Sequence, residues 1–218
     1  MRPHKSLLKL QKVAIKRLNY FEQLLSTVGS NNSFEQNETT LAYITIELLN
    51  TWVNFSRSFY LSCTIFPKTV SGNRITTTML LNSFNDAIGV AISQTNRRRS
   101  PNNQGIWHRK DEPTWHDPNV IIKICRYIGC SNIAEIESAL SGGQTVFTNL
   151  PTFRNFFAHR NQQTELAAKT VALQKYGISA PQLKISQILL LLPLSETQPL
   201  IIIWIVEMKI TIELLCYE

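Results

Sequence analysis

Residues 5–28 read KSLLKLQKVAIKRLNYFEQLLSTV. At roughly 100° per residue, the apolar side chains of this stretch fall within one arc of about 80°; they are Leu7, Leu10, Ala14, Leu18, Phe21, Leu25 and Val28. A second set falls within about 60° on the opposite side and consists of Lys5, Lys9, Lys12 and Lys16. The pattern predicts an amphipathic helix that ends at Gly29-Ser30-Asn31-Asn32. Its lysine face is either a solvated surface or a contact for a phosphate backbone.

Helical periodicity continues along the rest of the chain. A second helix is expected from about Glu38 to Phe66, ended by Pro67, with an aromatic core of Trp52, Phe55, Phe59 and Tyr60. Further helices are expected at about 76–95, 118–129, 131–140, 149–160, 162–176, 181–192 and 198–216. We therefore predict an all-α chain that folds as one compact helical bundle over residues 1–218, with one long basic loop at about 96–118.

Two apolar runs near the end of the sequence, Ile188–Leu194 and Leu200–Val206, call for comparison with a membrane span. The polar residues Ser195–Gln198 divide them, and Glu207 and Lys209 end the second run. Neither run approaches the ~20 residues that a spanning helix needs. Buried core helices are therefore expected, and no membrane partner.

The charge balance favours an anionic partner. The sequence has 22 Lys and Arg against 15 Asp and Glu, which gives a net charge of +7. Nucleic acid and anionic membrane surfaces are the usual partners of such a surplus, although many basic proteins carry it for solubility alone. The content of 44% hydrophobic and 17% charged residues excludes a disordered chain or a disulfide-stapled mini-protein.

The four cysteines do not have the spacing of a metal site. They are Cys63, Cys125, Cys130 and Cys216. Zinc sites use two spaced pairs, and here Cys125 and Cys130 have no second pair. Because basic residues interrupt the apolar residues of the first helix, no signal-peptide core is expected. Reduced thiols in a cytoplasmic protein are the expectation.

The stretch at 96–118 is rich in basic residues and contains two Trp-His pairs, Trp107-His108 and Trp115-His116. Its basic residues are Arg97, Arg98, Arg99, Arg109 and Lys110. Such a loop can hold a nucleic-acid strand by charge and stacking. Alternatively, the tryptophans pin the loop to the body of the protein. His108, His116 and Asp117 are metal-ligand types but lack a fixed helical spacing, and no metal is expected.

The segment Pro151–Arg160 reads PTFRNFFAHR. Pro151 suits the first turn of a helix. With Arg154 at 0°, Asn155 lies near 100° and His159 near 140°, whereas Leu150, Phe153 and Phe157 lie on the other flank. One flank can then pack into a core while Arg154, Asn155 and His159 share a polar face. Asn155 and His159 are four apart, so they can form a hydrogen bond that fixes the imidazole tautomer.

In these residues the sequence resembles the HEPN superfamily, whose ribonucleases carry Arg, a polar residue, and His after a gap of four to six. Arg154-Asn155-x-x-x-His159 fits that pattern. The resemblance covers about ten residues around Phe153–Asn161; elsewhere it is one of helical pattern. It implies a helical bundle that forms a two-fold homodimer, in which two motifs share one cleft.

Active members of this superfamily cut RNA without a metal or other cofactor, and they leave a 2′,3′-cyclic phosphate. The resemblance implies that His159 transfers the proton, that Arg154 stabilises charge on the phosphate, and that Asn155 orients His159 or the phosphate. Arg160 is an accessory phosphate-binding candidate. The expected biological role is that of a toxin or a defence effector with RNA as substrate.

One departure bears on regulation. Superfamily toxins paired with a nucleotidyltransferase antitoxin often carry Tyr two residues after the His, as a target of adenylylation. Here that position is Asn161, and the next tyrosine is Tyr176. An antitoxin or regulator, if used, is expected as a separate chain. Two alternatives stay open: a non-catalytic HEPN module that binds RNA or a partner protein, and a membrane-surface protein that uses the lysine face.

Overall fold

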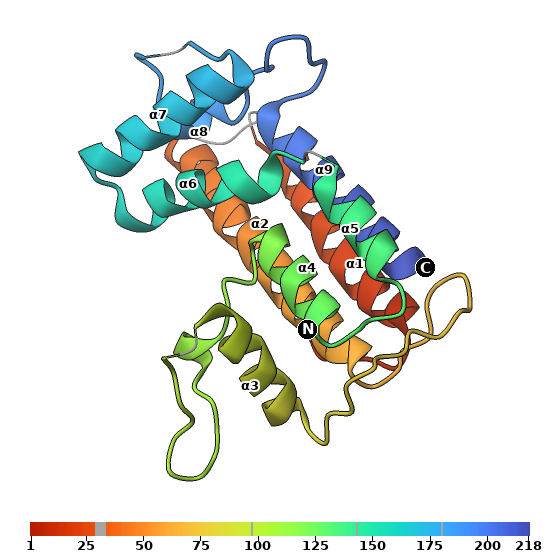
Figure 1. The fold of residues 1–218 in the computed structure, drawn as a ribbon. Coiled ribbons are helices and arrows are strands. Elements are labelled where there is room, and N and C mark those ends of the chain that lie inside the picture. Colours follow the sequence, from red (N-terminus) through yellow and green to blue (C-terminus); the bar gives the residue numbers. More distant parts are fainter. Residues whose placement is uncertain (29–33, 97, 143, 180) are drawn as a thin grey trace. The chain divides into compact units, whose positions relative to one another are not determined.

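In the part of the chain that the structure describes, all named secondary-structure elements are helices (Figure 1). The computed structural model describes residues 1–28, 34–96, 98–142, 144–179 and 181–218. The helices are α1 (Leu7–Ser26), α2 (Phe34–Cys63), α3 (Phe84–Thr95), the short 3-10 helix η1 (Arg109–Asp111), α4 (Pro118–Tyr127), α5 (Ile133–Ser141), α6 (Val146–His159), α7 (Gln162–Tyr176), α8 (Ile185–Ile188) and α9 (Leu200–Tyr217). The prediction of an all-α chain is confirmed.

The chain divides into two compact units. Unit 1 contains residues 1–14, 52–143 and 211–218, and unit 2 contains residues 15–51 and 144–210. The long helices α1, α2 and α9 each contribute residues to both units. The prediction of one domain over residues 1–218 stays a prediction.

The burial of α1 and α2 follows the periodicity of the sequence. Of the seven residues expected on the core face of the first helix, Leu7, Leu10, Ala14, Leu18 and Phe21 are fully buried. The last two, Leu25 and Val28, are only half-buried, and Val28 lies beyond the end of α1. The four lysines of the opposite face, Lys5, Lys9, Lys12 and Lys16, are exposed. In α2 the predicted aromatic core is fully buried, at Trp52, Phe55, Phe59 and Tyr60. Both helices are therefore amphipathic for the reason that the sequence indicated, with ends that differ by a few residues from those expected.

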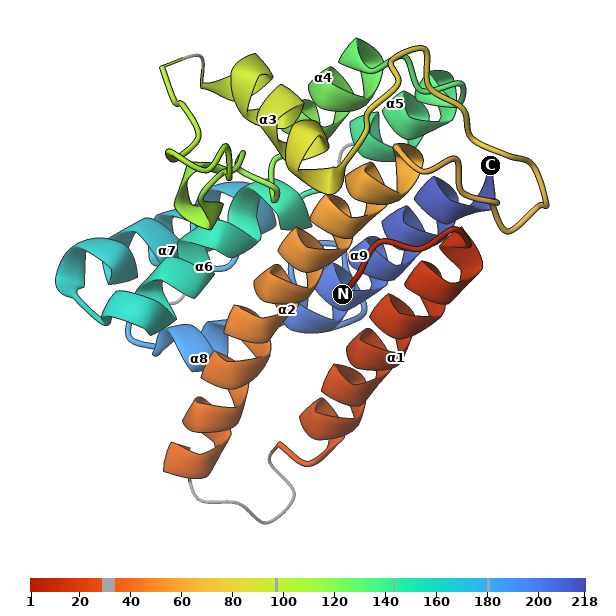
Figure 2. The ribbon, with the colours of Figure 1, turned by 90° about the horizontal axis from the view of Figure 1, so that it is seen from below.

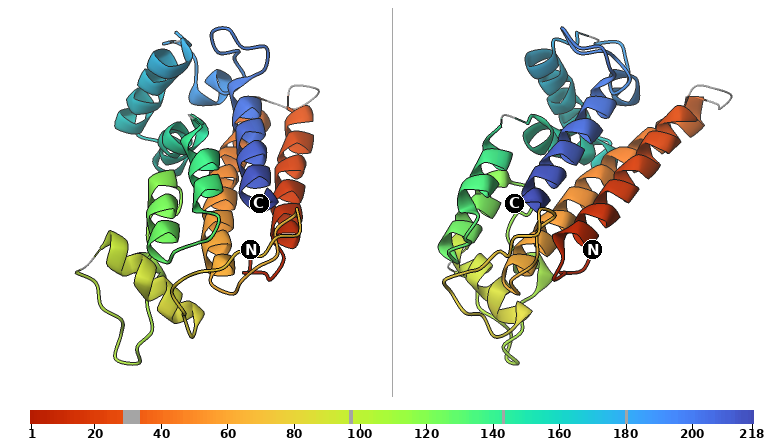
Figure 3. Two further views of the ribbon diagram at one scale, coloured as in Figure 1. Left: turned by 45° about the vertical axis from the view of Figure 1, so that its right-hand side comes forward. Right: turned by 90° about the vertical axis from the view of Figure 1, so that its right-hand side faces the viewer.

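In unit 1 the third helix is shorter than predicted. Helix α3 begins at Phe84 because Ser83 accepts a hydrogen bond from the Asp86 backbone, as an N-cap does. The preceding residues instead pair with the chain that follows α4: the Thr78 amide donates to the Gly129 carbonyl at 3.2 Å, and the Ser131 amide donates to the Thr76 carbonyl at 2.9 Å. The expectation of helix from residue 76 was wrong because this backbone bonds to another segment. Helix α4 packs against both α3 and α5 (Figure 3).

In unit 2, α6 and α7 form an antiparallel hairpin, and α7 also packs against α8 (Figure 2). The helix expected at 181–192 is reduced to α8, which has four residues. After it the backbone turns: the Leu194 amide donates to the Tyr176 carbonyl, and the Leu200 amide donates to the Leu191 carbonyl. Only Ile188 of the apolar run 188–194 is therefore helical, as the last residue of α8; the rest is a loop and not the core helix that we expected, with Leu192 and Leu194 exposed.

The second apolar run does form a helix, α9. Its inward residues include Leu200, Trp204 and Met208, which are fully buried. Among the described residues, no helix combines the length and the apolar character required to cross a bilayer.

Two glycines with positive φ give a direct test of packing in unit 1. At Gly129, which has φ +66°, an added Cβ would overlap the Thr78 side chain; at Gly105, which has φ +75°, a Cβ would meet nothing within 4 Å. We expect Gly105→Ala to lower the free energy of unfolding by about 1 kcal/mol, from the left-handed backbone alone. Gly129→Ala should cost about 2–4 kcal/mol, because steric overlap is added. Urea titration of both variants measures this, and equal losses would show that the contact with Thr78 is unimportant.

Candidate functional site

The Arg-Asn-His motif lies in the last turns of α6 and not at the start of a helix. Helix α6 begins at Val146, so Pro151 is inside it. The expectation that Pro151 marks the first turn was wrong, since helical residues already precede it. The packing flank was predicted correctly: Leu150 and Phe153 are fully buried, Phe157 is 5% exposed, and the Phe153 ring meets Trp204 of α9 edge-on at 5.0 Å.

The first residue of α6 is held by a carboxylate from α9. Glu207 accepts a hydrogen bond from the Val146 amide at 2.9 Å and another from the Thr145 hydroxyl at 3.4 Å. A carboxylate at this position satisfies an amide that has no partner within the helix and interacts favourably with the helix dipole. Burial raises the pKa of Glu207, although the hydrogen bonds from Val146 and Thr145 oppose that shift.

A buried hydroxyl connects α6 to α7 and α9. Tyr176, at the end of α7, is 7% exposed. Its oxygen accepts from Asn149 Nδ2 at 2.9 Å and from Trp204 Nε1 at 2.8 Å, and it donates to Thr145 Oγ1 at 3.0 Å. Burial raises the pKa of Tyr176, so this hydroxyl is a neutral structural group. It is also the next tyrosine after His159 in the chain, and its burial and three bonds leave it unavailable for covalent modification.

The three motif residues share the outward face of α6, as predicted. Arg154 is half-buried, and Asn155 and His159 are exposed. Arg154 Nη1 donates a long hydrogen bond of 3.5 Å to Asn155 Oδ1. The expected bond between Asn155 and His159 is not formed, because the Asn155 oxygen faces Arg154 instead. Within the described residues the imidazole of His159 makes no hydrogen bond or ion pair.

Arg160 ends α6 in a left-handed conformation, with φ 47° and ψ 44°. Its guanidinium lies 3.6 Å from a carboxylate oxygen of Glu38 in α2, and Lys184 approaches the other oxygen at 3.3 Å. Arg160 is therefore partly neutralised by Glu38, but its side chain is still more than half exposed. Asn161 then caps α7 by accepting a hydrogen bond from the Thr164 amide at 2.9 Å. This cap gives the asparagine two residues after His159 a structural role.

The predicted basic loop lies in unit 1, whereas the motif lies in unit 2. Arg97 is outside the described residues. Arg99 pairs with Asp111 at 3.3 Å, and Arg109 donates to Asn54 Oδ1 at 3.2 Å. Arg98 and Lys110 are exposed, and among the described residues their side chains have no ion-pair partner. Arg109 is exposed as well, and its hydrogen-bond partner Asn54 is neutral. Arg98, Arg109 and Lys110 are therefore exposed positive charges without an ion-pair partner in the described part of the loop.

The tryptophans of the loop pin it to unit 1. Trp115 is 4% exposed and its Nε1 donates to Glu112, which also receives a bidentate bond from Arg57 of α2. Trp107 lies over Gly89 of α3, where any side chain would overlap the indole. The tryptophans were expected either to stack on nucleic acid or to anchor the loop to the protein. Trp115 anchors the loop, because its buried ring cannot stack on a base. Trp107 is half-buried.

Of the two histidines beside the tryptophans, His116 directly precedes Asp117, which has a structural role. Asp117 accepts a hydrogen bond from the Asn119 amide and so serves as the N-cap of α4. His116 is half-buried, and burial lowers its pKa, with Asp117 opposing the shift. Among the described residues, no group of three or more His, Cys, Asp or Glu side chains is arranged to hold a metal ion.

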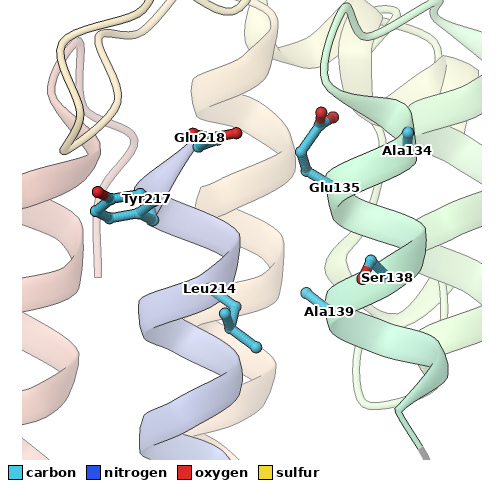
Figure 4. Close-up of a pocket in the computed structure, with 7 residues that line it drawn as sticks. All are labelled: Ala134, Glu135, Ser138, Ala139, Leu214, Tyr217 and Glu218. Carbon is cyan, nitrogen blue, oxygen red and sulfur yellow. The ribbon is translucent and has the colours of Figure 1, made fainter.

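Two cavities lie apart from the motif. The cavity of about 410 Å³ in unit 2 is lined by Thr145, Tyr176 and Glu207 among others. Thr145 and His159 are at opposite ends of α6, about 20 Å apart along the helix axis. In unit 1, a cavity of about 340 Å³ lies between α5 and α9 (Figure 4) and is lined by Ala134, Glu135, Ser138, Ala139, Leu214, Tyr217 and Glu218. Neither cavity contains a motif residue.

Comparison of the chain with family models, with curated proteins and with solved structures finds no match.

Several residues that position the motif were not found from the sequence. Glu207 lies 61 residues after the amide that it accepts from, and Glu38 precedes Arg160 by more than 100 residues. No local spacing connects such residues. For Tyr176 the sequence contained one weak indication of the network. Tyr176 is near the end of a predicted helix and Asn149 lies in the preceding one, and such a tyrosine and asparagine can form a buried polar pair.

The Tyr176 network predicts that removal of the hydroxyl oxygen strongly lowers the stability of the folded protein. Tyr176→Phe leaves Asn149 and Trp204 without their buried acceptor, and we expect the free energy of unfolding to fall by about 2–3 kcal/mol. Tyr127→Phe is the matched control, because Tyr127 is 50% exposed and its loss should change stability by less than about 0.5 kcal/mol. Urea or thermal denaturation measures both; similar values for the two variants would contradict the role given to Tyr176.

Proposed function

We propose that the protein is a metal-independent endoribonuclease of the HEPN type. The observation that carries the proposal is the exposed face at the end of α6. Arg154 is half-buried there, and Asn155 and His159 are exposed beside it, while the other flank of the same helix is buried against α9. A forked cation and an imidazole on one rigid helix are the groups that a phosphodiester cleavage needs. The net charge of +7 suits an RNA substrate.

In the proposed reaction, the ribose 2′-oxygen attacks the adjacent phosphorus. His159 takes the 2′-hydroxyl proton, the bond from phosphorus to the 5′-oxygen breaks, and a protonated imidazole gives a proton to that leaving oxygen. The products are a 2′,3′-cyclic phosphate and a 5′-hydroxyl. The Arg154 guanidinium stabilises the additional negative charge on the phosphoryl oxygens of the transition state. The neighbouring Asn155 holds that guanidinium by accepting its hydrogen bond.

A two-fold homodimer completes this chemistry. Transfer of one proton to a base and of another from an acid needs two groups in opposite protonation states. Two copies of His159, one from each protomer in a shared cleft, supply both. The bundle would then be of the HEPN type, and each α6 would present its outward face to the other.

The proposed setting is that of a cytoplasmic toxin or defence effector, neutralised or activated by a separate chain. Adenylylation of a tyrosine near the motif is not the proposed route of control. Asn161 occupies the position expected for that tyrosine and caps α7, and Tyr176 is buried in its network.

A non-catalytic module that binds RNA or a partner protein is the second candidate function. The observation that favours it is the side-chain arrangement around Asn155. Its oxygen accepts from Arg154, so it does not orient the imidazole of His159 within one copy of the chain. In this alternative the dimer and the basic surface are kept, and neither Arg154 nor His159 supports turnover.

Cleavage of total RNA and tRNA in the presence of a chelator tests the enzyme. We expect wild type to give products that end in 2′,3′-cyclic phosphate, and His159→Ala to lower the rate about 100-fold or more, since proton transfer contributes 10²–10⁴. Arg154→Ala should give a loss of similar size, because charge stabilisation in the transition state is removed. End-group analysis and rates at matched protein concentration measure both effects.

Gln163→Ala is the control for this experiment, because Gln163 is exposed and lies in the first turn of α7, close to the motif in the chain. It should cleave at the wild-type rate. Equal cleavage by all four proteins would identify a contaminating nuclease and contradict the proposal. RNA binding without cleavage by any of them would favour the binding module.

The basic loop makes a separate prediction about affinity. If Arg98 and Lys110 contact phosphates, the double variant Arg98→Gln/Lys110→Gln should bind single-stranded RNA more weakly at all sequences. The plot of log K against log salt concentration has a negative slope, and its magnitude should become smaller by about 0.7 for each contact removed. Lys175→Gln, an exposed lysine of α7, is the control and should keep the slope. An unchanged slope in the double variant would exclude these two side chains from the RNA interface.

A further inference from the structure

Three thiols that are distant in the sequence meet in unit 1. Cys63 is the last residue of α2, Cys125 lies in the last turns of α4, and Cys130 follows α4 by three residues. Cys63 and Cys125 are fully buried, and Cys130 is 3% exposed. All are free thiols. The sequence spacing indicated no such cluster, because Cys63 joins it only through tertiary packing.

The backbone that ends α4 brings two of these thiols side by side. Gly129 has φ +66°, its amide donates to the Arg126 carbonyl at 3.0 Å, and the Cys130 amide donates to the Cys125 carbonyl at 3.1 Å. These are the two hydrogen bonds of a Schellman motif. A contact between the side chains at these two positions frequently accompanies the motif, and here the thiols of Cys125 and Cys130 are hydrogen-bonded to each other. An isolated β-bridge between Thr77 and Cys130 holds the turn in place.

The three thiols are hydrogen-bonded in one direction. Those of Cys125 and Cys63 donate to the sulfur of Cys130, which lowers the pKa of Cys130 to about 5. The pKa of Cys63 is raised, first by its hydrogen bond to Cys125, then by that to Cys130 and by burial. The pKa of Cys125 is raised, first by its hydrogen bond to Cys130, while the hydrogen bond with Cys63 opposes that shift and burial adds to it. Since the thiolate and not the thiol is the nucleophile, we expect Cys130 to be the attacking member of the cluster. Cys130 is also the least buried of the three, and it precedes the exposed Ser131.

We propose that Cys125 and Cys130 are a peroxide-sensitive dithiol, which a hydroperoxide converts into an intramolecular disulfide. This modification site is independent of the motif on α6 and of RNA cleavage.

The step balances with hydrogen peroxide as the oxidant. The Cys130 thiolate attacks one peroxide oxygen; an S–O bond forms, the O–O bond breaks, and the departing hydroxide takes up a proton to become water. The sulfur of Cys125 then attacks the sulfenic sulfur of Cys130, the S–O bond breaks, and a second water leaves with the proton of the Cys125 thiol. The two thiols lose two electrons and two protons, and the peroxide is reduced to two waters.

Cys216 is an internal control for this chemistry. It belongs to the same unit and is also a free thiol. It is fully buried, and burial raises its pKa, so it has neither a thiol donor nor an activated sulfur. We expect it to stay reduced under conditions that oxidise the pair.

Peptide mapping of the full 218-residue chain tests the proposal directly. The reduced protein is treated with hydrogen peroxide at pH 6, where an ordinary thiol is almost fully protonated; it is then alkylated in urea and cut with trypsin. Cleavage after Arg126 separates Cys125 from Cys130, so the disulfide joins peptides 124–126 and 127–154. The peptides that contain Cys63 and Cys216, residues 58–68 and 210–218, should be recovered alkylated.

The folded state should accelerate the reaction. We expect the linked peptides to form at least about tenfold faster in the native protein than in urea, because only the fold supplies the thiol donors and the apposition. Equal rates in the two states, or recovery of all four cysteines as alkylated thiols, would overturn the proposal.

Serine variants identify which cysteine forms the disulfide with Cys130. Cys125→Ser should abolish the link, whereas Cys63→Ser and Cys216→Ser should keep the 124–126 to 127–154 pair. Circular dichroism of each variant identifies any that fails to fold, and the wild-type map does not depend on the variants. A link between peptides 58–68 and 127–154 in wild type would also overturn the proposal, because it would make Cys63 the partner.

Discussion

The hydroxyl of Tyr176 is the group on which the arrangement of unit 2 depends. A phenol oxygen can donate one hydrogen bond and accept two. Here it donates to Thr145 and accepts from Asn149 and Trp204, so its capacity is completely used. Because each of these groups is otherwise costly to bury, the network is stable only when α6, α7 and α9 lie as they do.

The contacts of α6 set the orientation of the candidate site at its end. Glu207 and the Tyr176 network hold the first turn of α6, and Phe153 packs on Trp204 in its middle. A helix held at its start and along one flank presents its last turn in a defined orientation. Arg154 and His159 therefore need few contacts of their own, and their polar atoms stay accessible to a ligand or to a second copy of the chain.

In unit 1 a backbone turn, rather than a side-chain hydrogen-bond network, positions functional candidates. Gly129 takes a conformation that a side chain would strain, and the resulting turn satisfies the last carbonyls of α4 while it places Cys130 against Cys125. The same segment bonds to residues 76–79, which keeps those residues out of α3. This one turn thus keeps residues 76–79 out of α3 and places two of the three thiols of the cluster together.

The amino-acid sequence by itself determined the helical class and the inward faces of the main helices. Leu7, Leu18 and Trp52 are buried where a period of 3.6 residues places them, because burial of one apolar face is a local property of a helix. It also placed Arg154, Asn155 and His159 on one polar face, for the same reason. The local pattern failed where the backbone bonds to distant segments. Residues 76–79 bond to the chain after α4, and Leu189, Leu191 and Leu194 bond to residues outside α8, so neither stretch forms the helix that was expected. Only the tertiary structure decided that Glu207 caps α6, that Glu38 pairs with Arg160 and that Cys63 joins Cys125 and Cys130, because each of these contacts joins residues far apart in the chain that no periodicity relates.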